Sequence, residues 1–577
     1  MKKHHYRFKI HDRFQIELKF DYPIRPNRSR EEVRVETFCF IPPTLYLNPT
    51  TYTKNDFYQD LQTYTRYGTP RLSIERLLDP QNELSPLYRV ARTRGEFAAG
   101  RSPDLAAERV VYELRILACI FRGETRDQGT LITELLSKPQ PSAKDFEDAA
   151  YLAGHFVEET GRMRSRVQEM QREFLGPHVP AEVTKGFAYV DEAMSVQLEG
   201  VSGKLYQRFT QALQAAADSG AAYPEVTETA RKLAAVMQDE EAYRRQAGYP
   251  TLVYATGSAA AGQANEYFLY RMGVLKKFAQ STLFLSVQTQ PGSRPLLYTL
   301  YALAAMGAMA FFVGLLFFLQ DVAPLNSLPY IVLAVIGYAF KDRIKDSLKL
   351  FFSERMTGWL RDRETKLIDR GPTKAVVGSA AEAFSFVEMG RVPEEVLVQR
   401  ARDELTELAE EGRPESVFKY QKAITLYADQ VFKLHRRVDR LNEILRLSVR
   451  SMLFRMDEPK KGLLLLETMD PEASKPAAEH EARLFAHAQA GGNGPELERE
   501  KNGHGLDGGS TRDVGLTPLH RLRTVKVYHV ILILRVLNRD DLGRWQSDLQ
   551  KFRLILSRNG IERVEFMEDG EKKILLP

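Results

Sequence analysis

The sequence predicts a mixed α+β membrane protein, in which a two-span transmembrane helical hairpin separates two cytoplasmic domains. Residues 295–320 contain no charged side chain, which indicates a membrane-spanning helix. Apolar residues before this run repeat mainly at helical spacing, whereas helical and alternating patterns both follow it. We therefore expect a mainly helical, bundle-like N-terminal domain with a short β segment, and an α+β C-terminal domain.

These patterns divide the chain into segments of different character. A chain of 577 residues is long enough for each folded part to bury its own core. The expected segments are a β-containing N-terminal segment (1–100), a helical bundle (101–255), a juxtamembrane segment (256–294), the transmembrane hairpin (295–340), a basic juxtamembrane helix (341–370) and an α+β C-terminal domain (371–577) with a flexible insertion at about 470–515.

Composition narrows the classes of function. The net charge is +5, and no basic stretch interleaved with aromatic residues occurs outside the flanks of the hairpin, which argues against nucleic acid as a partner. The two cysteines, Cys39 and Cys119, imply no disulfide framework and suit a reducing compartment. The N-terminal residues alternate apolar and charged side chains rather than forming a signal peptide, so we expect the N-terminal half to stay on the cytoplasmic side.

The hairpin is predicted from two apolar segments. At about 1.5 Å per residue, a helix over residues 295–320 exceeds the ~30 Å hydrocarbon core of a bilayer. Residues 328–340 form a second segment that begins after the plausible N-cap Ser327 and is shorter than the ~17 residues usually needed to span. Lys341 and Arg343 follow it directly, and their long side chains can snorkel back to the membrane surface.

Charge on the flanks of the hairpin predicts its orientation. Positive residues precede the first span and follow the second: Lys276, Lys277, Arg294, Lys341, Arg343, Lys345 and Lys349. The positive-inside rule then places both flanks in the cytoplasm. The alternative is a re-entrant second segment, which would place the C-terminal half outside. Small residues at helical spacing predict close packing within the hairpin or between subunits; they are Ala304, Ala308, Ala310, Gly314, Ala334 and Gly337.

Strands are predicted near the N-terminus, where apolar and polar residues alternate. The alternation covers residues 14–20 and 33–39, and Pro42 and Pro43 end the second strand. We hypothesise that these strands complete the sheet of the C-terminal domain.

Three helices are predicted to form an antiparallel bundle. Residues 143–175 carry an apolar seam at heptad spacing, and further helices lie near 184–217 and 225–246. The seam indicates either a coiled coil or the ordinary core stripe of a globular helical domain.

The region after the hairpin is predicted to begin with a helix that has one apolar and one basic face. This helix, within residues 341–370, either binds anionic lipid or packs on its own cytoplasmic domain. Beyond it, strands are expected at 384–389, 416–426, 524–537 and 561–568, and helices at 393–412, 431–452 and 541–560.

No motif predicts a catalytic residue, a cofactor or a metal site. Residues 255–265 are rich in Gly and Ala but lack the GK[ST] of a phosphate-binding loop, so we interpret them as a linker. Asp148, His155 and Glu159 share one helical face, but they flank the apolar seam, where solvated charges are usual, and a catalytic metal site needs an open position besides three ligands.

The sequence favours a membrane-anchored cytoplasmic scaffold or sensor that acts through protein–protein interaction, with no catalysis evident. Its expected partners are the bilayer of the cell inner membrane, anionic lipid at the basic helix, and another protein or a second copy of the chain. One alternative is an oligomeric channel or transport subunit, with Asp321 and Asn326 at the mouth of a pore formed by the hairpin. Another is a membrane-bound enzyme whose site is assembled from distant residues.

Overall fold

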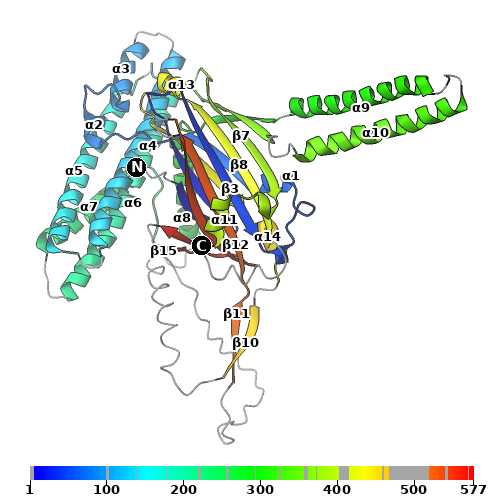
Figure 1. Ribbon diagram of the computed structural model, residues 1–577. Coiled ribbons are helices and arrows are strands. Elements are labelled where there is room, and N and C mark those ends of the chain that lie inside the picture. Colours follow the sequence, from blue (N-terminus) through cyan, green and yellow to red (C-terminus); the bar gives the residue numbers. More distant parts are fainter. Residues whose placement is uncertain are drawn as a thin grey trace, which may run out of the picture.

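Two stacked β-sheets form the centre of the protein, with a helical bundle on one side and a helical hairpin projecting from the other (Figure 1). The fold is mixed α+β, as predicted. The computed structural model describes residues 6–98, 103–138, 141–176, 178–218, 223–254, 259–292, 294–322, 324, 327–355, 361–371, 373–401, 415–457, 460–466, 519–539, 543–568 and 571–577.

The larger sheet has nine antiparallel strands in the order β15-β14-β13-β12-β3-β8-β7-β6-β5. Its strands come from both halves of the chain. They are β3 (Arg30–Ile41), β5 (Ser286–Pro291), β6 (Arg363–Ile368), β7 (Val376–Val387), β8 (Ser416–Tyr427), β12 (Tyr528–Arg539), β13 (Trp545–Ser557), β14 (Gly560–Glu568) and β15 (Glu571–Leu575).

The N-terminal strand β3 lies in the middle of this sheet, between β12 and β8. Val35 is opposite Val536 on one side and Lys422 on the other. The backbone of β3 is therefore hydrogen-bonded to C-terminal strands along both edges, and the hypothesis that N-terminal strands complete the C-terminal sheet is confirmed. The prediction that Pro42 and Pro43 end this strand is also confirmed, since β3 stops at Ile41.

The smaller sheet packs face to face on the larger one. Its order is β1 (Tyr6–Asp12), β2 (Gln15–Pro23), β9 (Arg440–Ser448) and β4 (Leu61–Tyr67). Phe8 of β1 stacks on Phe552 of β13, with ring centroids 4.4 Å apart. The buried Lys422 of β8 bridges the two sheets, because its ammonium lies 2.7 Å from Glu382 on β7 and 2.5 Å from Glu443 on β9.

Helices occupy most of the chain between β3 and β5, apart from β4. They are α1 (Lys54–Asp60), which precedes β4, and α2 (Ile74–Leu78), α3 (Pro86–Ala98), α4 (Pro103–Leu136), α5 (Ala143–Glu173), α6 (Ala181–Asp218), α7 (Pro224–Gln246) and α8 (Ala259–Gln280). Helices α4 to α7 pack against one another, so the bundle contains α4 in addition to the three predicted helices. The predicted heptad seam of α5 faces the bundle interior, where Phe146, Phe156 and Met163 are buried.

The remaining short elements cover the sheets or extend from them. Helix α11 packs Val396 against Phe38 and Ile533 on the outer face of the larger sheet. These elements are η1 (Pro43–Leu45), η2 (Met389–Arg391), α11 (Glu394–Ala401), α13 (Ala428–Leu434), α14 (Arg450–Leu453), and the two-stranded sheet of β10 (Lys460–Leu466) and β11 (Leu519–Val525).

Two of the predicted C-terminal helices are wrong. Residues 431–452 contain β9 between the short helices α13 and α14, and residues 541–560 contain β13. In β9, Leu441 and Leu445 are four residues apart, a spacing that places two side chains on one face of a helix and equally on one face of a strand. The segment forms a strand because its backbone pairs with β2 on one side and β4 on the other. The strands predicted at 416–426, 524–537 and 561–568 are confirmed as β8, β12 and β14, although the described strand β12 begins at Tyr528.

Predictions for the segments around the hairpin also need correction. Within the supposed linker 255–265, residues from Ala259 onward belong to α8, which packs on α4 and α6. The helix predicted within 341–370 ends at Arg355, and β6 follows, because Arg363–Ile368 pairs with both β5 and β7. The predicted insertion at 470–515 and residues 402–412 of a predicted helix lie outside the described residues.

Candidate functional site

The hairpin consists of α9 (Arg294–Val322) and α10 (Leu328–Arg355), which lie side by side and project away from the sheets (Figure 1). Its two ends are joined to neighbouring strands. Helix α9 follows β5, α10 precedes β6, and these strands pair with Pro291 opposite Arg363. The Gly292 amide donates a hydrogen bond of 3.0 Å to the Asp362 carbonyl. The base of the hairpin is therefore fixed to the edge of the larger sheet.

Small residues line the contact between the two helices. Ala304 and Ala308 are buried, although most of their neighbours on α9 are exposed. A Cβ atom on Gly337 would lie 2.4 Å from a methyl carbon of Leu315, so a side chain at this position would displace Leu315. The predicted close packing is thus found within the hairpin. Gly314, in contrast, has no neighbour near the position of a Cβ atom.

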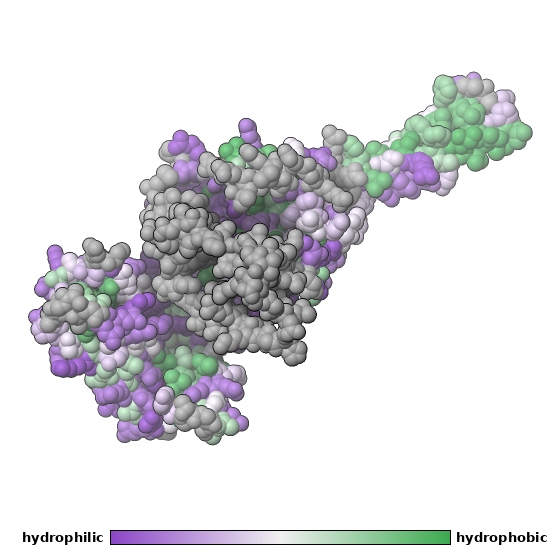
Figure 2. Space-filling model, turned by 90° about the horizontal axis from the view of Figure 1, so that it is seen from below, coloured by the Kyte–Doolittle hydropathy of each residue, from purple (hydrophilic) through white to green (hydrophobic). Residues whose placement is uncertain are grey.

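The outer surface of the hairpin is apolar, as Figure 2 shows for its far end. Large apolar side chains on both helices are exposed to an extent that is unusual for the surface of a soluble monomer. The exposed residues are Tyr298, Leu303, Met306, Met309, Phe311, Val313, Phe317, Phe318, Leu328, Ile331, Val332, Leu333, Val335, Ile336, Tyr338 and Phe340.

One helix of the described chain is long and apolar enough to cross a membrane, by length and composition. It is α9, over Tyr298–Asp321. Helix α10 does not meet the same criterion, because its apolar stretch ends at Phe340 and Lys341, Asp342 and Arg343 follow. The structure therefore supports one candidate span.

Charged side chains collect on α10 beside the apolar base of α9. The Lys341 ammonium lies 3.7 Å from the centre of the Tyr338 ring, in a cation–π contact. Lys345 forms an ion pair of 3.0 Å with Asp342. Lys349 lies above the Tyr301 ring of α9, with 6.0 Å between the ammonium and the ring centroid. Apolar surface thus surrounds the distal half of the hairpin, whereas the basal half has one polar side.

The structure does not assemble a site from the residues that the sequence brought to attention. His155 lies 3.5 Å from Glu159, but Asp148 is exposed, and no group of three or more possible metal ligands occurs among the described residues. Asp321 is exposed near the tip of the hairpin, whereas Asn326 lies outside the described residues.

Both cysteines are buried free thiols. Burial raises the pKa of the Cys119 thiol to about 12 and also raises that of Cys39. Neither group is therefore a ready nucleophile near neutral pH, because the reactive form of cysteine is the thiolate.

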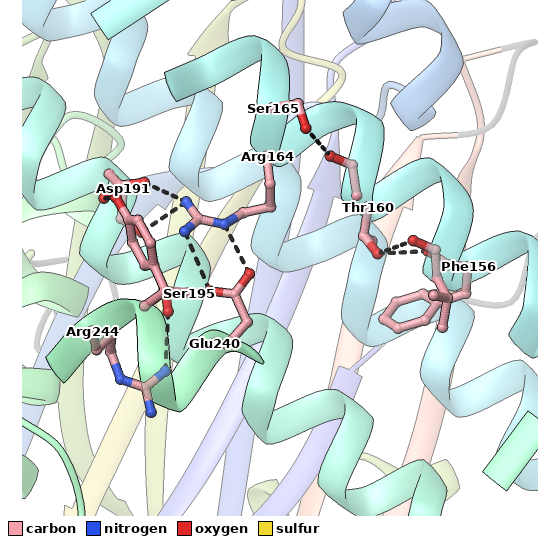
Figure 3. Close-up of polar contacts among 11 residues, drawn as sticks. Phe156, Thr160, Arg164, Ser165, Asp191, Ser195, Glu240 and Arg244 are labelled. Atoms are coloured by element: carbon pink, nitrogen blue, oxygen red, sulfur yellow. Dashed lines mark hydrogen bonds and ion pairs between the residues drawn. The ribbon is translucent and has the colours of Figure 1, made fainter. Parts of the chain in front are cut away.

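A buried network of charges that sequence reasoning missed lies inside the helical bundle (Figure 3). The guanidinium of Arg164 on α5 donates to Asp191 on α6 at 2.5 Å and to Glu240 on α7 at 3.1 Å. Arg244 of α7, which is fully buried, donates to the Ser195 hydroxyl at 3.0 Å. These residues come from three helices, so spacing along one helix gave no signal for the network. The arrangement can fix the register of the helices.

A second polar chain joins the bundle to the sheets. The Tyr112 hydroxyl of α4 lies 2.9 Å from Nδ1 of His435, whose Nε2 lies 2.7 Å from Oδ1 of Asp369. The Tyr67 hydroxyl donates to the same carboxylate at 3.1 Å. Burial raises the pKa of Asp369, but the hydrogen bonds from His435, the Gly371 amide and Tyr67 outweigh it and hold this pKa below its usual range. These hydrogen bonds thus stabilise the Asp369 carboxylate anion at the junction of the bundle and the sheets.

Comparisons with protein-family models, curated proteins and solved structures find no match for this chain. The exposed apolar surface of the hairpin is the structural feature on which a functional proposal can rest.

Proposed function

We propose that the chain is an integral membrane protein, anchored by the α9–α10 hairpin, and that it acts as a cytoplasmic scaffold or sensor through protein–protein contacts. The observation that carries this proposal is the exposed apolar surface of a hairpin that projects from a folded body. Burying such a surface among lipid chains removes it from water, which is favourable by about 25 cal/mol per Å².

Pairing of the flanking strands supports the same-side topology of the proposal. Because β5 and β6 are neighbours in one sheet, a chain that enters the bilayer through α9 must return to the same face of the membrane. A topology with the C-terminal half outside would separate β3 from β8 and β12 and break the centre of the larger sheet. We therefore favour a hairpin that crosses twice.

The short apolar part of α10 fits this topology if Lys341 lies at the membrane surface. Residues 328–340 span about 20 Å as a helix, less than the ~30 Å hydrocarbon core. Snorkelling of Lys341 and local thinning of the bilayer compensate for such a mismatch. The positive charges of α10 then lie at the cytoplasmic face, in agreement with the positive-inside rule.

The anchor is tested by cysteine labelling in intact cells. Pro324 at the tip of the hairpin and Ala247 on the bundle are both exposed, so a cysteine at either position can react. A membrane-impermeant maleimide should label Pro324→Cys in intact cells. It should label Ala247→Cys only after the membrane has been permeabilised. The native cysteines are buried and serve as an internal background. Protection of Pro324→Cys in intact cells would contradict two spans, and labelling of Ala247→Cys there would contradict a cytoplasmic body.

The scaffold role is tested by cross-linking in the same membranes. An amine-reactive cross-linker should convert the 65.8 kDa chain into discrete larger species before detergent extraction. Exposed lysines on the body, such as Lys232, make such a reaction possible. Recovery of the uncross-linked chain alone, under conditions that cross-link a known membrane complex, would argue against a stable partner.

A further inference from the structure

Three basic side chains lie on β4, α4 and α8, elements that pack together. They are Arg66 of β4, Arg122 of α4 and Lys276 of α8. Each interacts electrostatically with at least one of the other two. This group, which we name the β4–α4–α8 basic site, lies in the body of the protein and includes no residue of the hairpin.

Backbone contacts fix the positions of these side chains. The chain after α8 is hydrogen-bonded to β4 on either side of Arg66, through the Leu283 carbonyl, which accepts from Tyr67 at 2.8 Å, and the Leu285 amide, which donates to Thr65 at 3.1 Å. The Cys119 thiol donates to the Ala279 carbonyl at 3.3 Å and joins α4 to α8. Arg122 and Lys276 each lie three residues, or about one helical turn, from that contact.

No hydrogen bond or ion pair joins any of the three side chains to a carboxylate among the described residues, although Arg66 is partly buried. The Nε atom of Arg66 is buried without a hydrogen-bond acceptor, and Oδ1 of Asn442, the residue opposite Arg66 on β9, is buried without a donor. Such unsatisfied buried polar atoms are costly and uncommon in native proteins, so they call for an explanation.

Positive side chains and two carboxylates, Glu17 and Asp21, lie near the site. Burial lowers the pKa of Lys276, and repulsion from Arg122, Lys19 and Arg66 lowers it further. Lys19 and Arg446 share the carboxylate of Glu17 on β2. The carboxylate of Asp21 on β2 attracts the Arg66 guanidinium electrostatically. The two residues lie on opposite sides of Asn442 of β9, which pairs with both of them. An anion bound between the cations would relieve their mutual repulsion.

We propose that the β4–α4–α8 basic site binds a phosphate-bearing ligand, held by Arg66, Arg122 and Lys276. Arginine presents a planar fork of N–H donors that matches phosphate oxygens, and lysine adds a compact positive charge. A phosphate accepts several charge-assisted hydrogen bonds and carries more than one negative charge, which suits three unpaired cations better than a single carboxylate does. A soluble phosphate and a lipid headgroup share this chemistry.

The proposal is tested by calorimetric titration of the full chain in nanodiscs of uncharged lipid, with pyrophosphate as the probe. We expect saturable binding that weakens about tenfold or more in Arg66→Gln and in Lys276→Gln, because each loses a charge-assisted hydrogen bond. The matched control is Arg231→Gln, an exposed arginine of α7 that pairs only with Glu228 in the described structure and should leave binding unchanged.

A variant that is expected to bind pyrophosphate more tightly separates the proposal from a loss of binding caused by misfolding. Asp21→Asn removes the carboxylate that acts on Arg66 and should tighten pyrophosphate binding several-fold. Repeating the titration in nanodiscs that contain anionic lipid distinguishes the sources: competition identifies a lipid headgroup, and unchanged binding identifies a soluble phosphate. Two results would overturn the proposal. One is that the wild type shows no saturable binding of pyrophosphate; the other is that Arg66→Gln, Lys276→Gln and Asp21→Asn all bind it with the wild-type affinity.

Discussion

The helical bundle and the α9–α10 hairpin are both built from long helices that pack side by side, but they place polar side chains oppositely. The bundle buries Arg164, Asp191 and Arg244 in its interior. The hairpin buries Ala304 and Ala308 and exposes Phe, Leu, Ile and Val over much of its surface. Each arrangement fits a different solvent around the helices.

The difference shows which force holds each pair of helices together. In the bundle, water surrounds the outer faces, and burial of apolar seams such as that of α5 supplies most of the stability. The buried ion pairs add specificity of register, because moving one helix would leave a charge without its partner. In the hairpin, the lipid surrounding that we propose would remove the hydrophobic drive between the helices, so close contact at small residues would have to supply the attraction.

The largest expected effect comes from breaking the buried network of the bundle. Arg164→Met leaves Asp191 and Glu240 without their cation and should lower the free energy of opening α5 by about 3–5 kcal/mol. Hydrogen–deuterium exchange of α5 amides in the full chain measures this change. Arg166→Met is the matched control on the same helix, because its partly exposed pairs with Glu169 and Glu173 are worth at most about 1 kcal/mol. Equal effects of the two substitutions would contradict the proposed difference.

The sequence made the hairpin easier to predict than the bundle network. Residues 295–320 contain no charge, and that composition alone indicates a long apolar helix. The apolar seam of α5 was also visible, because periodicity is a property of one segment. The partners of Arg164 were not visible, since Asp191 and Glu240 lie on other helices and become neighbours only after the bundle forms.

The same reasoning explains the errors in the C-terminal half. The spacing of Leu441 and Leu445 satisfies a helix and a strand alike, and only the neighbouring strands select between them. Leu549, Phe552 and Leu556 of β13 fall at helical spacing, yet Trp545 to Leu556 pair with β12, so the predicted helix at 541–560 is a strand. The β4–α4–α8 basic site was missed for a related reason, as Arg66, Arg122 and Lys276 are far apart in sequence.

A smaller effect is expected where the hairpin helices touch. Gly337→Leu forces a side chain into the space of Leu315 and should weaken α9–α10 packing by about 1–3 kcal/mol, the usual cost of overpacking. Gly314→Leu is the matched control, because a Cβ atom there meets nothing within 4 Å. Spin labels at Leu303 and Leu350, both exposed, report the separation of the helices at the base of the hairpin in nanodiscs.

The distance distribution between these labels should broaden in Gly337→Leu and stay narrow in Gly314→Leu. Broadening in both variants would indicate that Gly314 also has a neighbour in the membrane. Because the described residues of the same chain place no atom there, that neighbour would belong to a second chain. Narrow distributions in both would mean that the strand pair β5–β6, rather than the contact at Gly337, holds the helices together. Either result would change the comparison, because the hairpin would then depend on a partner or on the sheet instead of on its own small residues.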